Sequence, residues 1–113
     1  MGGVRIIGID PGLGVTGYGV IEVDGGRALH VCHGVIRTRA SDPRAARLVA
    51  LRERVCAIAR ETGAAAAAVE AGFVGDNARS AMALGEARAA AIIGLADAGL
   101  EVAEYAPLLV KQT

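Results

Sequence analysis

Apolar residues along this chain fall into short runs separated by glycine, proline and aspartate. The first run, Val4–Asp10, is rich in β-branched residues and flanked by glycine, which is typical of a buried strand. The runs Val15–Val23 and Leu29–Arg39 follow, and the segment Asp24–Gly26 between them is a strong hairpin turn signal. The pattern therefore predicts three consecutive antiparallel strands.

After this meander the apolar period changes to that of a helix. Asp42 is expected to accept hydrogen bonds from the free N–H groups at the start, Pro43 to lie in the first turn and Gly63 to end the helix. Arginines and glutamates occupy the remaining positions, so one side of the helix should face the core. The expected core face consists of four aliphatic residues at helical spacing: Leu48, Leu51, Val55 and Ile58.

The second half of the chain is rich in alanine. Ala64–Glu70 follows the break at Gly63 and ends in Val-Glu, which favours a short interior strand although alanine prefers helix. A second helix is predicted from about Asn77 to Ala98, with alanine nearly all round, so it should be covered on more than one side. Leu100–Ala106 reads as a fifth strand. The order β-β-β-α-β-α-β predicts an α/β fold with a mixed five-stranded sheet.

Length and composition narrow the class of protein. The 113 residues suffice for one domain, and no apolar run approaches the about 20 residues of a membrane span. The N-terminus lacks a signal-peptide pattern, so we expect a cytoplasmic protein. Twelve basic and twelve acidic residues leave nucleic-acid binding open. Cys32 and Cys56 lack metal-type spacing and are expected to be free thiols.

Two acidic residues end strands that lie far apart in the sequence. Asp10 closes the first predicted strand and Glu70 the fourth, and sites in α/β sheets form beyond the carboxyl ends of strands. If these strands are neighbours, the two carboxylates share one space and favour a cation between them. Oxygen ligands without cysteine or histidine nearby indicate Mg²⁺ or Mn²⁺, which commonly act on phosphate esters. Two plainer interpretations stay open: "DPG" is a good turn sequence, and a strand-end glutamate can simply face solvent.

The first acidic residue is followed by a glycine-rich stretch, "GLGVTGYG". Its glycines allow either a tight turn or close approach of a phosphate to the backbone, and their spacing does not match a dinucleotide-binding fingerprint. Thr16 and Tyr18 are candidate phosphate contacts or ordinary strand residues.

Further candidates for nucleic-acid binding follow Glu70. Phe73, the only phenylalanine, lies in a glycine-containing loop, where an aromatic ring can stack on a base or anchor the loop. Asn77 and Arg79 stand at a helix start, which suits either a helix cap or a phosphate site. Lys111 by itself is expected to be an ordinary exposed cation and does not decide the function.

Three sequence blocks, "GIDPGLGVTGYGVIE", "VEAGFVGDNARSAMALGEARAAAI" and "EYAPLLVKQT", together resemble the RuvC family of bacterial Holliday junction resolvases. The resemblance covers essentially the whole chain. It implies a ribonuclease H-like fold and a Mg²⁺-dependent endonuclease that cuts four-way DNA junctions symmetrically in recombination and repair. It also implies a homodimer that works with the RuvA and RuvB branch-migration proteins.

The resemblance assigns roles to individual residues. Asp10 and Glu70 match the first two catalytic, metal-binding acidic residues of the family, Phe73 the aromatic that meets DNA at the junction centre, and Lys111 a lysine of the DNA-binding surface. The family completes its site, which holds two ions, with two acidic-type positions on a C-terminal helix. The expectation is therefore a single nuclease domain over residues 1–113, C-terminally incomplete, with its C-terminal helices missing and with weak or no activity alone.

Three other functions remain open as alternatives to a junction resolvase. An ATPase or kinase of the actin and sugar-kinase type also begins with Asp-x-Gly in a hairpin, but it needs a second such loop. A ribonuclease H-like nuclease of ribosomal RNA processing shares the "GIDPG" block. In a non-catalytic interaction protein, the alanine-rich helix Asn77–Ala98 would serve only for pairing.

Overall fold

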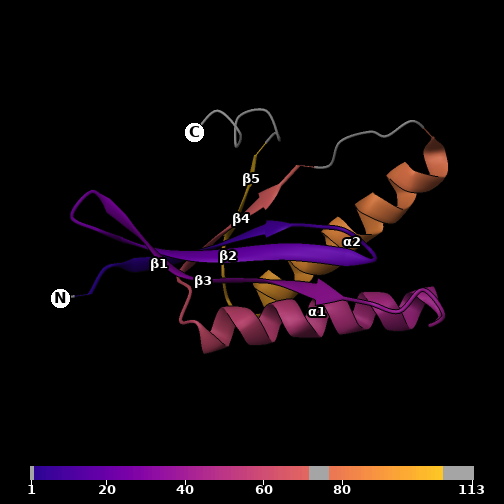
Figure 1. The fold of residues 1–113 in the computed structure, drawn as a ribbon, viewed down its shortest axis with the longest axis horizontal. Coiled ribbons are helices and arrows are strands. Elements are labelled where there is room, and N and C mark those ends of the chain that lie inside the picture. The colour runs from indigo at the N-terminus through magenta and orange to yellow at the C-terminus, as the bar shows by residue number, and fades with distance from the viewer. Residues whose placement is uncertain (1, 72–76, 106–113) are drawn as a thin grey trace.

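The computed structural model describes residues 2–71 and 77–105. These residues form one five-stranded sheet, in the strand order β3-β2-β1-β4-β5, together with two helices (Figure 1). The elements are β1 (Val4–Asp10), β2 (Val15–Asp24), β3 (Arg27–Arg37), α1 (Arg44–Glu61), β4 (Ala66–Glu70), α2 (Ala78–Asp97) and β5 (Val102–Tyr105).

The sheet is mixed, as the order of elements predicts. Strands β1, β2 and β3 are antiparallel neighbours, and β4 and β5 run parallel to β1 after their helical crossovers. The hairpin turn has positive φ angles at Gly25 (57°) and Gly26 (82°), so β2 and β3 pair right up to it. For this reason β3 begins at Arg27, earlier than predicted. It ends at Arg37, which pairs with the first residue of β2.

Alternate strand residues on one face of the sheet pack against both helices to form the core. The sheet contributes Ile7, Ile9, Val20, Ile36, Ala67 and Val69, and the helices contribute Leu51, Val55, Ile58, Ala87, Ala91 and Leu95. The predicted core face of α1 is confirmed, with Leu48 at the margin of the core. The alanine-rich segment before Glu70 is a strand, as predicted; it pairs with β1 and contacts α2.

The predicted C-terminal end of α1 is confirmed, and the predicted N-terminal cap is wrong. Gly63 has φ of 68° and its N–H donates to the Arg60 carbonyl, so it ends the helix as expected. Capping by Asp42 is wrong. Pro43 occupies the cap position without any side-chain cap, and the Asp42 N–H donates to the Arg39 carbonyl in a turn before the helix.

Helices α1 and α2 approach closely at Gly94. A Cβ atom at Gly94 would lie 2.5 Å from the Arg52 carbonyl oxygen and 3.1 Å from Cβ of Val55. Beside this contact the Arg52 guanidinium donates two hydrogen bonds to the Asp97 carboxylate, at 2.6 and 3.0 Å. These hydrogen bonds lower the pKa of Asp97 below its ordinary value. The exposed outer side of α2 includes Met82 (64% exposed) and Ile93 (45%).

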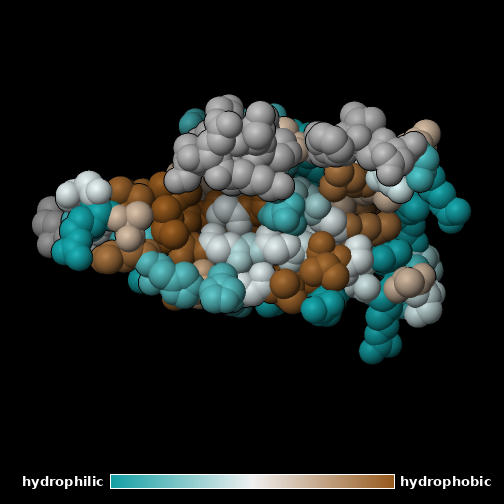
Figure 2. All heavy atoms as spheres, turned by 45° about the horizontal axis from the view of Figure 1, so that its top comes forward, coloured by the Kyte–Doolittle hydropathy of each residue, from teal (hydrophilic) through white to brown (hydrophobic). Residues whose placement is uncertain are grey.

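The sheet face opposite the helices is partly apolar. Its exposed large residues are Val4, Val15, Ile21 and Val35. Figure 2 shows apolar surface over the hairpin end of the sheet, at the left of the view.

Within the described residues, neither helix has the length and hydropathy needed to cross a membrane. Both cysteines are free thiols, as predicted, with Cys56 buried and Cys32 half-buried.

Candidate active site

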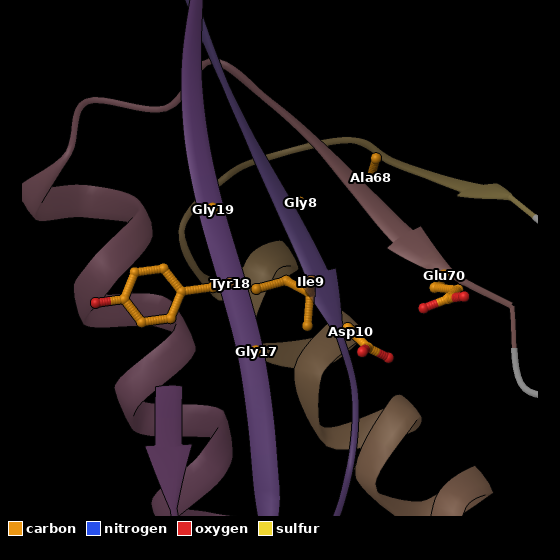
Figure 3. Close-up of a pocket in the computed structure, with 8 residues that line it drawn as sticks. All are labelled: Gly8, Ile9, Asp10, Gly17, Tyr18, Gly19, Ala68 and Glu70. Carbon is orange, nitrogen blue, oxygen red and sulfur yellow. The ribbon is translucent and has the colours of Figure 1, made fainter. Parts of the chain in front are cut away.

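The parallel pairing of β1 with β4 brings the two acidic strand ends together. Ile9 is paired with Val69, and the next residue on each strand is Asp10 and Glu70. Since paired residues of parallel strands point to the same face, both carboxylates leave the same edge on the same side of the sheet. Figure 3 shows them at adjacent strand ends, lining one pocket. The structure thus places both carboxylates on one face of the sheet, at one pocket.

The pocket has a volume of about 280 Å³ and lies on the sheet face opposite the helices. Its lining consists of Gly8, Ile9, Asp10, Gly17, Tyr18, Gly19, Ala68 and Glu70. Glycine pairs with glycine at Gly8 and Gly19, and Asp10 pairs with Gly17. The floor beside the carboxylates is therefore made of backbone and very small side chains, which leaves room for a bulky substrate chain.

The loop after Asp10 is held by a buried hydroxyl group. Thr16 is fully buried, and its Oγ1 accepts a hydrogen bond from the Gly12 N–H (3.1 Å) and donates one to the Gly12 carbonyl (2.7 Å). Gly12 must be small, because a Cβ atom there would lie 2.3 Å from the Val15 carbonyl oxygen. Thr16 is consequently a loop anchor, and the interpretation of its hydroxyl as a phosphate contact is wrong. The Tyr18 ring points away from Asp10 (Figure 3).

A second threonine ties the same loop to β3 and α1. The Thr38 N–H donates to the Gly14 carbonyl (3.1 Å), and Thr38 Oγ1 donates to the Leu13 carbonyl (2.5 Å). Arg47 of α1 donates its Nε–H to the same hydroxyl at 2.9 Å. The analysis of sequence alone missed Thr38 and Arg47, because only the pairing of Val15 with Arg37 places Thr38 beside the loop.

Replacing Thr16 by valine should destabilise the protein by about 1–3 kcal/mol, because two part-buried backbone groups of Gly12 lose their partner while the side-chain shape is kept. Urea denaturation of the wild type and the variant measures this difference. Thr16→Ser keeps the hydroxyl and should recover most of the loss. Equal unfolding midpoints for wild type and Thr16→Val would show that the loop does not depend on this hydroxyl.

The structure describes two of the four predicted DNA contacts, Asn77 and Arg79. Asn77 caps α2, since its Oδ1 accepts the Ser80 N–H at 2.8 Å, and Arg79 is exposed in the first turn. Phe73 and Lys111 lie outside the described residues.

A further arginine, Arg37, is exposed at the end of β3. Its partner Val15 is the first residue of β2, near the end of β1. The sequence alone does not indicate this position for Arg37, because the order of strands, which is a tertiary property, sets its place.

The two carboxylates fit a hard divalent cation. Both supply oxygen ligands, Asp10 is exposed and Glu70 half-buried, and two negative charges in one pocket favour a bound cation. Among the described residues, no cluster of three or more acidic, histidine or cysteine side chains suits a metal. A Mg²⁺ ion has about six ligands. The pair therefore provides part of a coordination shell, and the rest must come from water, substrate or other groups.

The family model and the most similar curated proteins carry the same description. The family model described as crossover junction endodeoxyribonuclease RuvC matches residues 6–113. A protein of that name from Caulobacter sp. (strain K31) is 50% identical over 96% of this chain and 64% of its own length. Another from Burkholderia ambifaria (strain MC40-6) is 50% identical over 96% of this chain and 59% of its own. The chain thus spans less than two thirds of the length of these relatives.

Solved structures agree with the sequence relatives. Thermus thermophilus RuvC in complex with Holliday junction substrate matches with a TM-score of 0.88 and 30% identity, covering 96% of this chain and 68% of that one. The likeness confirms the predicted ribonuclease H-like fold. An Aquifex aeolicus Ppx/GppA phosphatase matches with a TM-score of 0.52 and 14% identity, over 92% of this chain and 36% of that chain, and shows a likeness of fold alone.

Proposed function

Because the chain belongs to the RuvC family, we propose that it carries the metal-binding and DNA-binding part of an endonuclease that resolves four-way DNA junctions. Residues 1–113 would form a ribonuclease H-like nuclease domain, and the relatives contain further residues outside the matched region. The observation that carries this proposal is the shared pocket of Asp10 and Glu70 at the carboxyl ends of β1 and β4. The Thermus relative bound to a Holliday junction supports the choice of substrate.

In the proposed mechanism, Asp10 and Glu70 would hold Mg²⁺, with Mn²⁺ as a substitute, and the complete site would take two ions. When bound, the ions supply an activated water and offset the charge on the phosphoryl oxygens. The floor of Gly8, Gly17 and Gly19 leaves space for a DNA strand to lie against the sheet. Thr16 fixes the loop that follows Asp10 and so limits its movement.

DNA binding would also use residues outside the pocket lining. Arg79 and the N–H groups at the start of α2 suit a phosphate, as does the exposed Arg37, while Asn77 orders the helix start. Phe73 is proposed to meet a base at the junction centre, and Lys111 to contact a phosphate, because both match DNA-binding positions of the family.

The proposed assembly is a homodimer, since a symmetric junction needs two matched cuts. The exposed apolar residues Met82 and Ile93 on α2 support pairing through this helix. RuvA and RuvB are the proposed partners, in the cytoplasm, where the chromosome lies.

Cleavage of synthetic DNA tests the function directly. A polypeptide of the full length of the relatives should cut a four-way junction at symmetric positions only when Mg²⁺ or Mn²⁺ is present, and should leave linear duplex of the same sequence uncut. ATP binding by the same sample, without junction cleavage, would favour the kinase-type alternative. Cleavage of precursor ribosomal RNA in place of junctions would favour the RNA-processing alternative.

A further inference from the structure

The only two histidines of the chain, His30 and His33, lie on edge strand β3. Residues three apart on a regular strand point to opposite faces of the sheet. In β3, however, His30 pairs with Ile21 and Cys32 pairs with Val20, so Val31 is an extra residue in a β-bulge. The bulge reverses the alternation, and both imidazole rings therefore stand on the same face of the sheet.

The two rings are in direct contact. Nε2 of His30 and Nδ1 of His33 are 2.9 Å apart, and the ring centroids are separated by 5.1 Å with the planes tilted by 59°. Both side chains are exposed, so an ion from solvent can reach them. Cys32 lies between them in sequence but packs against the core on the other face.

We propose that His30 and His33 form a two-nitrogen site for a divalent transition-metal ion of the Ni²⁺, Cu²⁺ and Zn²⁺ group. Two nitrogens bound about 2.1 Å from one ion at a right angle are about 3 Å apart, which matches the separation here. The hydrogen bond between the rings uses one proton. On metal binding that proton moves to the other nitrogen of its own ring, so two neutral rings offer two lone pairs without net proton release.

This site differs in chemistry from the carboxylate pair. Imidazole nitrogen favours borderline transition metals, whereas Asp10 and Glu70 offer the oxygen ligands preferred by Mg²⁺. His33 pairs with Gly19 of β2, which also lines the pocket, so the width of one strand, β2, separates the histidine pair on β3 from Asp10 on β1. An ion held by both rings would link the two sides of the bulge and stiffen the edge of the sheet.

Titration calorimetry of the untagged chain with Ni²⁺ tests the site. The wild type should bind one ion at the histidine pair, and His30→Asn or His33→Asn should weaken that binding about tenfold or more, because a second ligand on the same surface raises the effective concentration. Circular dichroism should show that both variants stay folded. Nickel should also raise the melting temperature of the wild type and not that of the double variant.

Two variants and one competitor locate the ion. Cys32→Ser and Asp10→Asn should leave this Ni²⁺ binding unchanged, and excess Mg²⁺ should not displace the ion. Loss of binding in Cys32→Ser would assign the metal to the thiol, and loss in Asp10→Asn would assign it to the carboxylate pair. Either result, or equal binding by wild type and the double histidine variant, would overturn the proposal without touching the nuclease function.

Discussion

Replacing Asp10 by asparagine should lower the rate of junction cleavage about a thousandfold or more, while junction binding remains largely intact. Asparagine has nearly the same shape but no charge, so the pocket loses one of the two anionic ligands proposed for the cation. A metal contributes several kcal/mol to transition-state stabilisation, and each 1.36 kcal/mol corresponds to a factor of about ten in rate. Single-turnover cleavage with saturating enzyme, together with a gel-shift binding assay, separates the two effects in a polypeptide of the full length of the relatives.

Asp42→Asn is the matched control for this experiment. Asp42 is an exposed aspartate in the turn before α1, away from the pocket lining, so its neutralisation changes the net charge equally and should not affect cleavage. Cleavage by Asp10→Asn at the wild-type rate would refute the metal role of Asp10.

Two glycines of α2 should respond to alanine in opposite directions. At Gly94 the new methyl group would meet the Arg52 carbonyl oxygen at 2.5 Å, and a backbone atom of the facing helix cannot rotate away. The helices must then separate, and we expect a loss of about 1–3 kcal/mol in the free energy of unfolding. At Gly85 nothing lies within 4 Å, so alanine should stabilise the helix by about 0.5–1 kcal/mol.

Urea denaturation of both variants against the wild type measures the two changes. Because the substitution and the helix are the same, intrinsic helix propensity cancels in the comparison. A stabilised Gly94→Ala variant would show that α1 and α2 do not meet as closely as described.

Much of the fold follows from local pattern. The apolar runs, the glycine breaks and the order of elements suffice to predict the strands, both helices and the mixed sheet. The acidic pair was also predictable, since Asp10 and Glu70 each end a strand and the topology of such sheets brings strands of this kind together. The one failed helix cap shows the limit of local rules, because Asp42 is engaged in a turn and Pro43 takes its place.

The features that escaped prediction depend on register. Thr38 looks like an ordinary surface residue until the pairing of β2 with β3 places it beside the loop after Asp10. His30 and His33 would point to opposite faces in a regular strand, and only the extra residue Val31 brings them together. A single extra residue in a pair of strands leaves no distinct pattern in the sequence. The sequence alone therefore indicates neither the contact of Thr38 with the loop nor the contact of His30 with His33.

The glycines on the pocket floor have a consequence for attempts to improve this protein. A Cβ atom at Gly8, Gly17 or Gly19 would meet only ordinary contacts of 3.8 to 4.0 Å, so the sheet itself would accept a larger residue. Glycine inside a strand lowers stability, and a β-branched replacement would raise it. A thermostability screen would therefore reward filling these positions and, in doing so, select variants that melt later and whose pocket beside Asp10 and Glu70 is closed.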